Sequence, residues 1–347
     1  MKKFLMVVLV MVLVSGLFLG GHCPSAQARS GADFYKGKTI KFLVPSSPGS
    51  GLDTVARILS TMLEKETGAT LVVINRPGGG YTIPINLLYD KPDTSGLTIS
   101  MVDMPSAVTG QLIELPRVRF DLKKMNWICT VNSGDTAAIV PSDSPYKTVA
   151  DLLKAKQLTA AATGPTSPTG LGSSIILRVV MGLPVKVVTG YAASPAMVKA
   201  VVQKEVDIAM TLYAAAASSI KAGMLGVPFV WNPERFRVMP EVPTIYEELE
   251  KTDILTPEKK FWLDTVVNLV HLQRGVITSP NVQPDNLKYL RDAMAKIVNS
   301  PAVGEKFDKL GYTKCYYSGE ETAERVNKIL STDPALKAQL KKMLEVK

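Results

Sequence analysis

The sequence predicts an α/β protein with two domains that are built in the same way. The first observation is local: residues 40–63 form an apolar run, a turn rich in Gly and Ser, and then apolar residues at helical spacing. The second observation is that the same order recurs in residues 158–181. The third is size, because 347 residues with 46% hydrophobic content favour two domains. Such units are typical of mostly parallel sheets, which bind ligands at the carboxyl ends of their strands.

The N-terminal residues predict an export signal that is cleaved after Ala28. Two lysines, at positions 2 and 3, precede an apolar stretch at residues 4–19 that is short for a membrane span. Ala26-Gln27-Ala28 then forms an A-x-A cleavage site. An uncleaved anchor and a lipoprotein modified at Cys23 remain as alternatives. No later run is apolar over the length of a span, so we expect a soluble, exported protein.

Composition argues against a nucleic-acid partner. The formal net charge is +9, but the basic residues are spread along the chain and form no run beyond pairs. A basic surface of this kind suits an anionic membrane or attracts anionic solutes. Two cysteines follow the signal, Cys129 and Cys315. The sequence leaves their pairing open, and two isolated thiols are the default.

The elements of the first domain follow in order from the pattern. Ile40–Val44 is a short buried strand, Pro45–Gly51 is a turn, and the apolar positions from Leu52 to Leu63 predict a helix. The next elements are expected to be a strand at 70–74, a Gly-rich turn at 75–80, a helix at 81–89, a strand at 97–102 and a helix that ends at 113.

The second domain repeats this order. Residues 125–140 are strand-like, a loop follows at 141–146, and a helix begins at 148. The remaining expectations are a strand at 158–163, a turn at 164–170, a helix at 171–181, a strand at 185–189, a helix at 196–203, a strand at 206–210, an apolar β-rich segment at 261–276, and helices at 284–299, 302–310 and 320–330.

Motifs for catalysis and nucleotide binding are incomplete. Residues 49–54, GSGLDT, lack the last glycine of G-x-G-x-x-G. His271 is the only histidine after the signal, and it lies in the segment read as an apolar strand, where a core role is usual. A Ser-His-Asp triad would have to use it, and one His with two distant Cys does not suggest zinc. We therefore expect no enzyme activity, no cofactor and no metal.

The turns at the strand ends favour a binding protein. Two α/β domains of this kind form a cleft whose walls carry N–H and hydroxyl donors, which suits a carboxylate without an arginine. Closure about a hinge would bury the ligand. The simpler alternative is that the turns are only structural loops, but several turns at corresponding positions argue for binding.

Six motifs in order resemble the Bug-type receptors of tripartite tricarboxylate transporters. They are KTIKFLVPSSPGSGLDTVAR, VVINRPGGG, PSDSPYKTVADL, TAAATGPTSPTG, VKVVTGYAASPAMVKAVVQKEVDIAM and MPEVPTIYEEL. The resemblance covers essentially the whole chain after the signal. It implies a two-lobed periplasmic binding protein of type II, the Venus-flytrap fold, with the cleft between two α/β domains. It also implies a small carboxylate ligand and a membrane permease with one large and one small subunit.

Carried over by position, the resemblance places ligand-binding residues in both lobes. The role of Asp53 is left open between capping the following helix and touching the ligand, and its negative charge argues for the cap. The expected residues are Ser46, Ser47, Gly49, Ser50, Gly51, Asp53, Asp103 and Ser106 in the first lobe, and Thr163, Gly164, Thr166, Ser167, Thr169, Tyr191, Ala192 and Thr211 in the second.

Three departures from the family pattern leave the ligand open, aliphatic or aromatic. The family's aromatic-Pro-Pro-Gly-Gly-Gly turn is here Ser46–Gly51, which adds hydroxyls and removes an apolar wall. Thr189–Ala193 lacks the lysine of the family's Pro-Tyr-Lys-Gly-Gly element. Residues 251–274 run longer and more apolar than usual.

The resemblance also sets the expected boundaries and partners. The first lobe is expected at residues 35–127 plus 262–347, the second at 128–261, and the hinge near 127–132 and 258–265. We expect a periplasmic monomer that delivers its ligand to the permease and binds no nucleic acid. A ligand-sensing receptor for a membrane kinase and a secreted hydrolase that uses His271 remain as alternatives.

Overall fold

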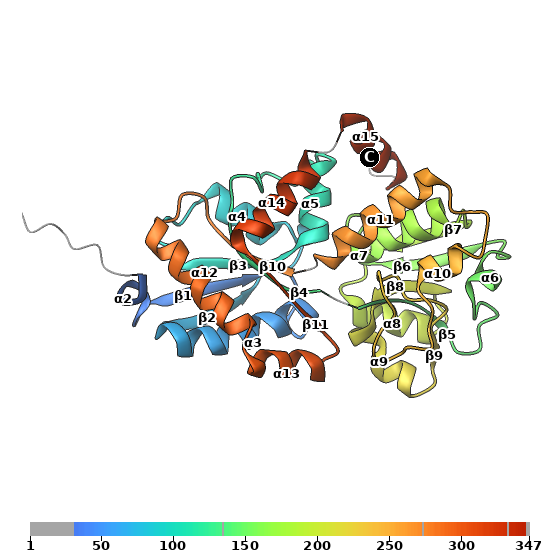
Figure 1. The fold of residues 1–347 in the computed structure, drawn as a ribbon, viewed down its shortest axis with the longest axis horizontal. Helices are drawn as coiled ribbons and strands as arrows, with labels where there is room; N and C mark the ends of the chain where they lie inside the picture. The colour runs from blue at the N-terminus through green and yellow to red at the C-terminus, as the bar shows by residue number, and fades with distance from the viewer. Residues whose placement is uncertain (1–30, 134, 273, 332, 345–347) are drawn as a thin grey trace, which may run out of the picture.

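The protein folds into two α/β lobes that lie side by side along its longest axis (Figure 1). The computed structural model describes residues 31–344 except 134, 273 and 332, so the predicted export signal lies outside the described residues. Each lobe is a sheet with helices packed on it, and the predicted α/β class is confirmed. In the described part of the chain, no helix combines the length and the apolar character that a membrane span needs.

The first sheet brings together strands from both ends of the chain. Its spatial order is β11-β4-β10-β3-β1-β2. The pairs β1–β2 and β1–β3 are parallel, whereas β10 runs antiparallel to β3 and β4, and β11 antiparallel to β4. The strands are β1 (Thr39–Val44), β2 (Thr70–Asn75), β3 (Thr98–Asp103), β4 (Asn126–Ser133), β10 (Arg274–Thr278) and β11 (Thr313–Ser318).

Helix α3, Gly51–Thr67, is the first to pack on this sheet. Its apolar face buries Val55, Leu59 and Leu63, and its C-cap Gly68 takes the left-handed conformation (φ 67°) that ends the helix. The other helices of the first lobe are α2 (Gly31–Tyr35), η1 (Gly79–Tyr81), α4 (Ile83–Asp90), α5 (Met104–Leu112), α12 (Pro284–Val298), α13 (Pro301–Lys309) and α14 (Gly319–Leu330).

The second sheet has the order β7-β6-β8-β5-β9. Strand β6 is parallel to β7 and β8, and β5 is antiparallel to β8 and β9. Because β5 is apolar and fully buried, it forms the inner part of the lobe. The strands are β5 (Thr136–Pro141), β6 (Leu158–Ala162), β7 (Val185–Thr189), β8 (Ile208–Leu212) and β9 (Leu225–Gly226).

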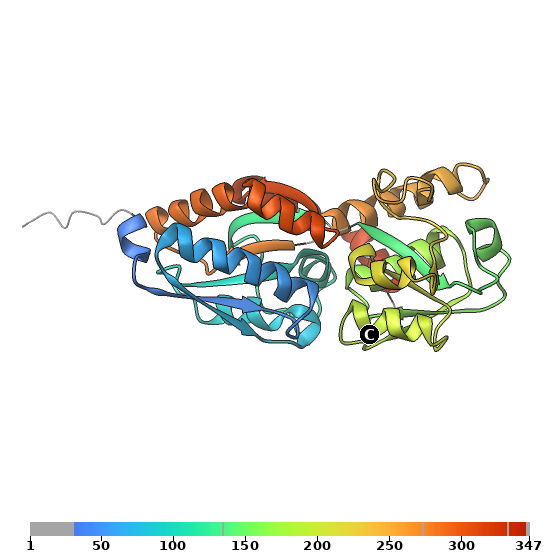
Figure 2. The same ribbon diagram turned by 90° about the horizontal axis from the view of Figure 1, so that it is seen from below.

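Helices cover both faces of the second sheet (Figure 2). One of them continues from α7 into the π-helical η2 and packs against β6, β7 and β8. Its partner on that side is α11. The helices of this lobe are α6 (Val149–Leu152), α7 (Pro168–Leu171), η2 (Gly172–Val180), α8 (Ser194–Val202), α9 (Tyr213–Lys221), α10 (Ile245–Leu249) and α11 (Pro257–His271).

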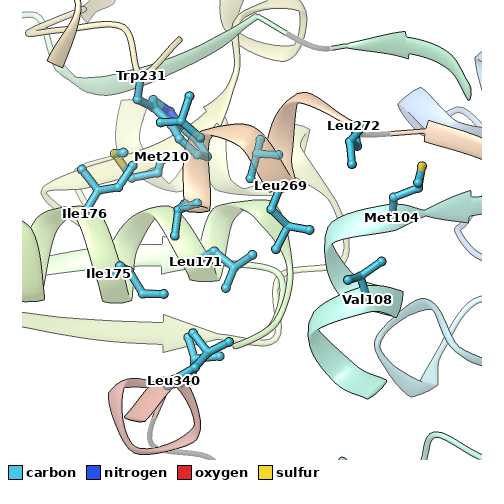
Figure 3. Close-up of a cluster of buried hydrophobic side chains, with 14 of the residues drawn as sticks. Met104, Val108, Leu171, Ile175, Ile176, Met210, Trp231, Leu269, Leu272 and Leu340 are labelled. Carbon is cyan, nitrogen blue, oxygen red and sulfur yellow. The ribbon is translucent and has the colours of Figure 1, made fainter. Parts of the chain in front are cut away.

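One apolar core runs through both lobes. It includes Met104 and Val108 of α5 in the first lobe, and Ile176 and Met210 in the second. Side chains of α11, among them Leu269, lie between these two groups (Figure 3). Two further cores are confined to single lobes, one between α3, α12 and the first sheet and one between α8, α9 and the second sheet. The lobes are therefore joined by packing as well as by chain connections.

The chain passes between the sheets later than the sequence suggested. Strand β4 ends at Ser133 and β5 begins at Thr136, whereas the expected passage was near 127–132. The chain returns to the first sheet between His271 and Arg274, whereas the expected position was near 258–265. The reason is packing: β4 pairs along its length with β10 and β11, and α11 packs on η2 of the second lobe.

Two segments were assigned wrongly from the pattern. The β-rich segment predicted at 261–276 is helix α11 up to His271, and only its end enters β10. The Thr256 side chain caps α11 by accepting a hydrogen bond from Lys259 N, and Pro257 follows at the first helical position. The strand-like run 125–140 is two strands that belong to different sheets.

The last described helix, α15 (Pro334–Met343), crosses to the second lobe, although the sequence placed it with the first. It packs on η2, and Arg178 Nη2 donates a hydrogen bond to Met343 O (2.6 Å). Leu340 is 4% exposed and lies on the η2 side of the shared core (Figure 3).

Leu340→Ala should lower the free energy of unfolding by about 2–5 kcal/mol, because it leaves a cavity in the shared core. Lys341→Ala is the matched control, since Lys341 is the exposed next residue of the same helix. Urea unfolding of both variants measures the difference. Equal effects would mean that α15 does not pack where the structure places it.

Candidate functional site

Two adjoining cavities lie between the lobes. The larger has a volume of about 310 Å³ and the smaller about 220 Å³. Ser46 and Tyr81 of the first lobe and Thr163 of the second line both cavities, so the two spaces form one continuous cleft.

The sheet topology places this cleft. Strand β1 ends two residues before Ser46, and β3 ends at Asp103. Strand β6 ends one residue before Thr163, and Thr211 is the last but one residue of β8. Parallel strands bring their carboxyl ends to one edge of a sheet. Because the passages between the sheets also lie at these edges, the two carboxyl edges face each other across the cleft.

Fifteen of the sixteen residues predicted for the site line the cleft. Asp53 is the exception, because neither cavity has it in its wall. Contact of these residues with a ligand remains a prediction. The larger cavity is lined by Ser46, Gly49, Ser50, Gly51, Asp103, Thr163, Thr169 and Thr211, and the smaller one adds Ser47, Ser106, Gly164, Thr166, Ser167, Tyr191 and Ala192.

The first-lobe turn is held by its own hydroxyls. Ser50 is the N-cap of α3, and its Oγ accepts a hydrogen bond from Asp53 N (3.3 Å). The hydroxyls of Ser46 and Ser50 share a hydrogen bond of 2.5 Å. Asn75 Nδ2 donates to Ser46 O (2.8 Å), which ties the turn to the end of β2. The serines that distinguish this turn from the family pattern therefore also stabilise it.

Asp53 supports the turn from beneath and is not its N-cap. It is 2% exposed, and its carboxylate accepts hydrogen bonds from Gly49 N (2.8 Å), Arg57 Nε (2.9 Å) and Asn75 Nδ2 (3.0 Å). Burial alone would raise the pKa of Asp53, but the hydrogen bonds from Arg57, Gly49 and Asn75 hold it below its ordinary value. The carboxylate is therefore ionised at neutral pH, and its hydrogen-bonding capacity is taken up by these protein donors.

The second-lobe turn is a closed hydrogen-bonded loop around Ser167. Ser167 Oγ donates to Gly164 O (2.7 Å) and accepts from Gly164 N (3.2 Å) and Gly170 N (3.1 Å). Thr163 N donates to Thr169 Oγ1 (3.0 Å). A side chain at Gly170 would lie 2.0 Å from Gly164 O, so the turn requires glycine there. The loop is thus fixed in shape before any ligand arrives.

Helix N-termini from both lobes border the larger cavity. Gly51 begins α3, Asp103 caps α5 through Ser106 N (3.1 Å), and the first residues of α8 and α9 lie in the opposite wall. Neither α8 nor α9 has a side-chain cap. The N-terminus of a helix carries unpaired N–H groups and a partial positive charge. The cavity wall is therefore suited to an anion.

Tyr81 was missed by the sequence reasoning. It follows three glycines with positive φ and itself has φ 70°, a conformation that is strained for an aromatic residue. Its hydroxyl forms a hydrogen bond with Thr163 across the cleft. Burial and the nearby Asp103 raise the pKa of Tyr81 to about 12, so it is neutral and can donate a hydrogen bond. The glycine run before it was the available signal.

Arg274 and Tyr312 were also missed, and both line the larger cavity. Arg274 begins β10 directly opposite Asp103 of β3. Burial raises the pKa of Asp103, while its hydrogen bonds with Ser106 and the charge of Arg274 lower it in part. The one signal in the sequence was that Arg274 follows an apolar segment and could be buried with it. A buried arginine is rare unless it is paired, so it would have been a candidate for the site.

The residues considered for other chemistry lie outside the cleft. His271 is the last residue of α11 and does not lie in an apolar strand. It lines a third cavity with Asp135 and Glu234, which meets the larger cavity at Tyr312. Burial lowers the pKa of His271. Cys129 and Cys315 are unpaired, and burial raises the pKa of both thiols. Among the described residues, no group of three or more His, Cys, Asp or Glu could hold a metal ion.

Asp53→Ala should lower the free energy of unfolding by about 1–3 kcal/mol, because Gly49 N and Asn75 Nδ2 lose the buried carboxylate that accepts their hydrogen bonds. The contribution is complete above the ordinary pKa of 3.8 and is lost as the pH falls through the lower folded-state value. The difference from wild type should therefore shrink in acid. Asp285→Ala, an exposed first-turn aspartate of α12, is the control for urea unfolding at pH 7 and pH 3. Equal losses in the two variants would contradict the role of Asp53.

Comparison with known proteins agrees with this geometry. Residues 55–336 match the family model of the tripartite tricarboxylate transporter family receptor. A UPF0065 protein from Pseudomonas sp. strain P51 is 28% identical over 242 residues, which cover 68% of this chain and 70% of the relative. The periplasmic binding protein BugD superposes with a TM-score of 0.73 at 18% identity, covering 90% of this chain and 99% of BugD.

A third comparison is an R. palustris protein whose structure was solved with adipate. It has a TM-score of 0.72 at 17% identity and covers 89% of this chain and 97% of its own. These likenesses confirm the two-lobed fold of periplasmic solute-binding proteins, and the family is one of receptors and not of enzymes. The chain belongs to the receptor family of the tripartite tricarboxylate transporters.

Proposed function

We propose that this receptor binds a small organic anion with a carboxylate group in the cleft between its lobes. The observation that carries the proposal is that helix N-termini from both lobes border one cavity. Hydrogen bonds between backbone N–H groups and a carboxylate are charge-assisted, with a net contribution of about 1.5–3 kcal/mol each. A few such bonds account for specific binding without a metal.

Unpartnered polar atoms in the cleft support the same function. Thr211 Oγ1, Trp231 Nε1 and Arg274 Nη1 are buried without a hydrogen-bond partner among the described residues, and all three residues line the larger cavity. Buried polar groups in folded proteins nearly always have a hydrogen-bond partner. A polar ligand would supply the missing partners.

The size of the cleft and the adipate-bound relative favour a small ligand. A cavity of about 310 Å³ is at the lower end of ligand pockets. The structure solved with adipate shares the fold of this chain and holds an aliphatic dicarboxylate. The hydroxyls of Ser46 and Ser50 would replace the aromatic wall that is usual in the family, so the non-carboxylate end of the ligand is expected to be polar.

Closure of the lobes would complete the site, with the hinge at the two passages between the sheets. Asp135 follows the first passage, and its Oδ1 accepts hydrogen bonds from Asn232 of the second lobe and Thr313 of the first, each at 3.1 Å. The shared core on the α11 side would stay packed during closure, because its side chains come from both lobes. The motion is then a rotation about that core.

A screen of small carboxylates should find at least one ligand that raises the melting temperature. The panel contains acetate, malate, adipate, citrate and benzoate at millimolar concentration, measured by thermal shift and then by calorimetry. A panel without any stabilising compound would contradict the proposed function.

Gly164→Val should weaken that ligand roughly tenfold or more without unfolding the protein, because the side chain has open space at the wall of the cleft and would occupy ligand volume. Gly304→Val is the matched control, since Gly304 also has open space but lies in α13, away from both cavities. Calorimetry compares the two affinities. Unchanged binding in Gly164→Val would place the site elsewhere.

We propose further that the protein is exported, cleaved after Ala28, and delivers its ligand as a monomer to a permease with a large and a small subunit. The family of the chain supports the delivery role. Deleting its gene should abolish uptake of the labelled ligand in cells that keep the permease. Full-length protein should restore uptake, and a form that begins at Arg29 should not, because it stays in the cytoplasm. Uptake that survives the deletion would contradict delivery, and rescue by the short form would contradict export.

A further inference from the structure

Arg274 is a buried cation in the wall of the larger cavity. It is 3% exposed, and it begins β10 at the edge of the first sheet that faces the second lobe. Arginine is almost never buried to this degree unless a partner neutralises it, since removing the charge from water is costly. The surroundings of its guanidinium therefore decide what the residue is for.

The guanidinium lies at the N-terminus of α3. Its Cζ stacks over the ring of Tyr312 at 4.5 Å from the centroid. A side chain at Gly51, the first residue of α3, would begin 2.6 Å from Arg274 Nη2 and 3.0 Å from Tyr312 Oη. The absence of a side chain at Gly51 thus lets the guanidinium approach the first turn of the helix.

Two positive features therefore meet at one point, where a single carboxylate, that of Asp103, lies opposite Arg274. The N-terminus of a helix carries a partial positive charge, which disfavours a neighbouring cation. Arg274 Nη1 has no hydrogen-bond partner among the described residues. Asp103 is the one carboxylate among the residues that line this cavity, but its Oδ1 is occupied as the cap of α5. This arrangement is balanced only when an anion enters.

We propose that Arg274 is the counter-ion of the ligand, so that a carboxylate of the ligand forms a buried ion pair with it beside Tyr312 and the first turn of α3. The inference rests on the proposed function and deepens it. The ligand must carry a full negative charge to pair with Arg274, whereas backbone N–H groups alone could also bind an uncharged acceptor. Esters and amides of the ligand should bind poorly. The planar fork of arginine suits two parallel hydrogen bonds to one carboxylate.

Arg274 should affect the stability of the unliganded protein, whatever the ligand is. Without an anion, Arg274 destabilises the protein, because a buried charge whose Nη1 has no hydrogen-bond partner among the described residues lies next to a helix N-terminus. Removing that charge should therefore leave the unliganded protein as stable as wild type or make it more stable. A structural arginine, such as one paired within the lobe, behaves in the opposite way.

Arg291 offers that contrast in the same lobe. It lies in α12, donates a hydrogen bond from Nε to Trp127 O (2.9 Å), and pairs with Glu320. Neither cavity of the cleft has Arg291 in its wall. Arg291→Gln should therefore destabilise the protein and leave ligand affinity unchanged, which makes it the matched control for Arg274→Gln.

The experiment measures stability and binding in wild type, Arg274→Gln, Arg274→Lys and Arg291→Gln. Urea unfolding in a buffer free of carboxylate, sulfate and phosphate gives the stability without an anion. Calorimetry with adipate, benzoate and inorganic sulfate, and with adipamide as an uncharged probe, gives the affinities. Arg274→Gln should lose roughly 10- to 100-fold in anion affinity. Arg274→Lys should lose less, because it keeps the charge without the fork.

A fifth variant, Asp103→Asn, tests the role of the Arg274 charge by removing the carboxylate opposite it. Asparagine caps a helix as well as aspartate does, so the hydrogen bond with Ser106 N is kept. Removing the negative charge that faces Arg274 should raise anion affinity several-fold. A loss of affinity in this variant would overturn the role of Arg274 as the counter-ion.

The remaining outcomes also separate the two proposals. The inference on Arg274 is overturned when Arg274→Gln keeps wild-type affinity for an anion that wild type binds. It is likewise overturned when Arg274→Gln loses as much unfolding free energy as Arg291→Gln. If wild type binds sulfate through Arg274 but no carboxylate, the proposed function fails and so does the carboxylate as the paired group, while Arg274 remains the counter-ion of a bound anion.

Discussion

The convergence of helix N-termini on the space between two sheets is the constraint from which the rest of the structure follows. Each strand–turn–helix unit that ends at the carboxyl edge adds N–H groups and partial positive charge to the same place. Some of these N–H groups donate to capping side chains of the protein, which are Ser50 at α3, Asp103 at α5 and Ser167 at α7. What remains faces the cleft, and Arg274 adds a full charge to it. The proposed anion would balance this positive charge.

The sequence was informative where the signal is local. The turns at 45–51 and 164–170 could be predicted because strand, small residues and helix follow one another directly, and the structure places both beside the cleft. Tyr81 and Arg274 could not, because their positions depend on partners far along the chain. Arg274 meets Gly51 and Asp103 only after β10 has inserted between β3 and β4. No local pattern carries that pairing.

The two segments that were assigned wrongly also owe their structure to partners far along the chain. Residues 257–271 are apolar on several sides, which resembles a strand, but they form a helix that packs between η2 and α5 and is buried by both lobes. Tertiary packing decides such a case over intrinsic preference. The run 125–140 stays apolar while it leaves one sheet and enters another. Hydrophobicity marks burial, and it does not say in which lobe a residue is buried.

The placement of the two ends of the described chain has a practical consequence. Gly31 begins α2 at the outer end of the first lobe, whereas α15 leaves the first lobe and packs on the second (Figure 1). Rotation of one lobe against the other would therefore change the distance between the termini. Fluorophores attached at the two ends would report on occupancy of the cleft by energy transfer. The fold thus lends itself to a reagentless optical sensor for its ligand.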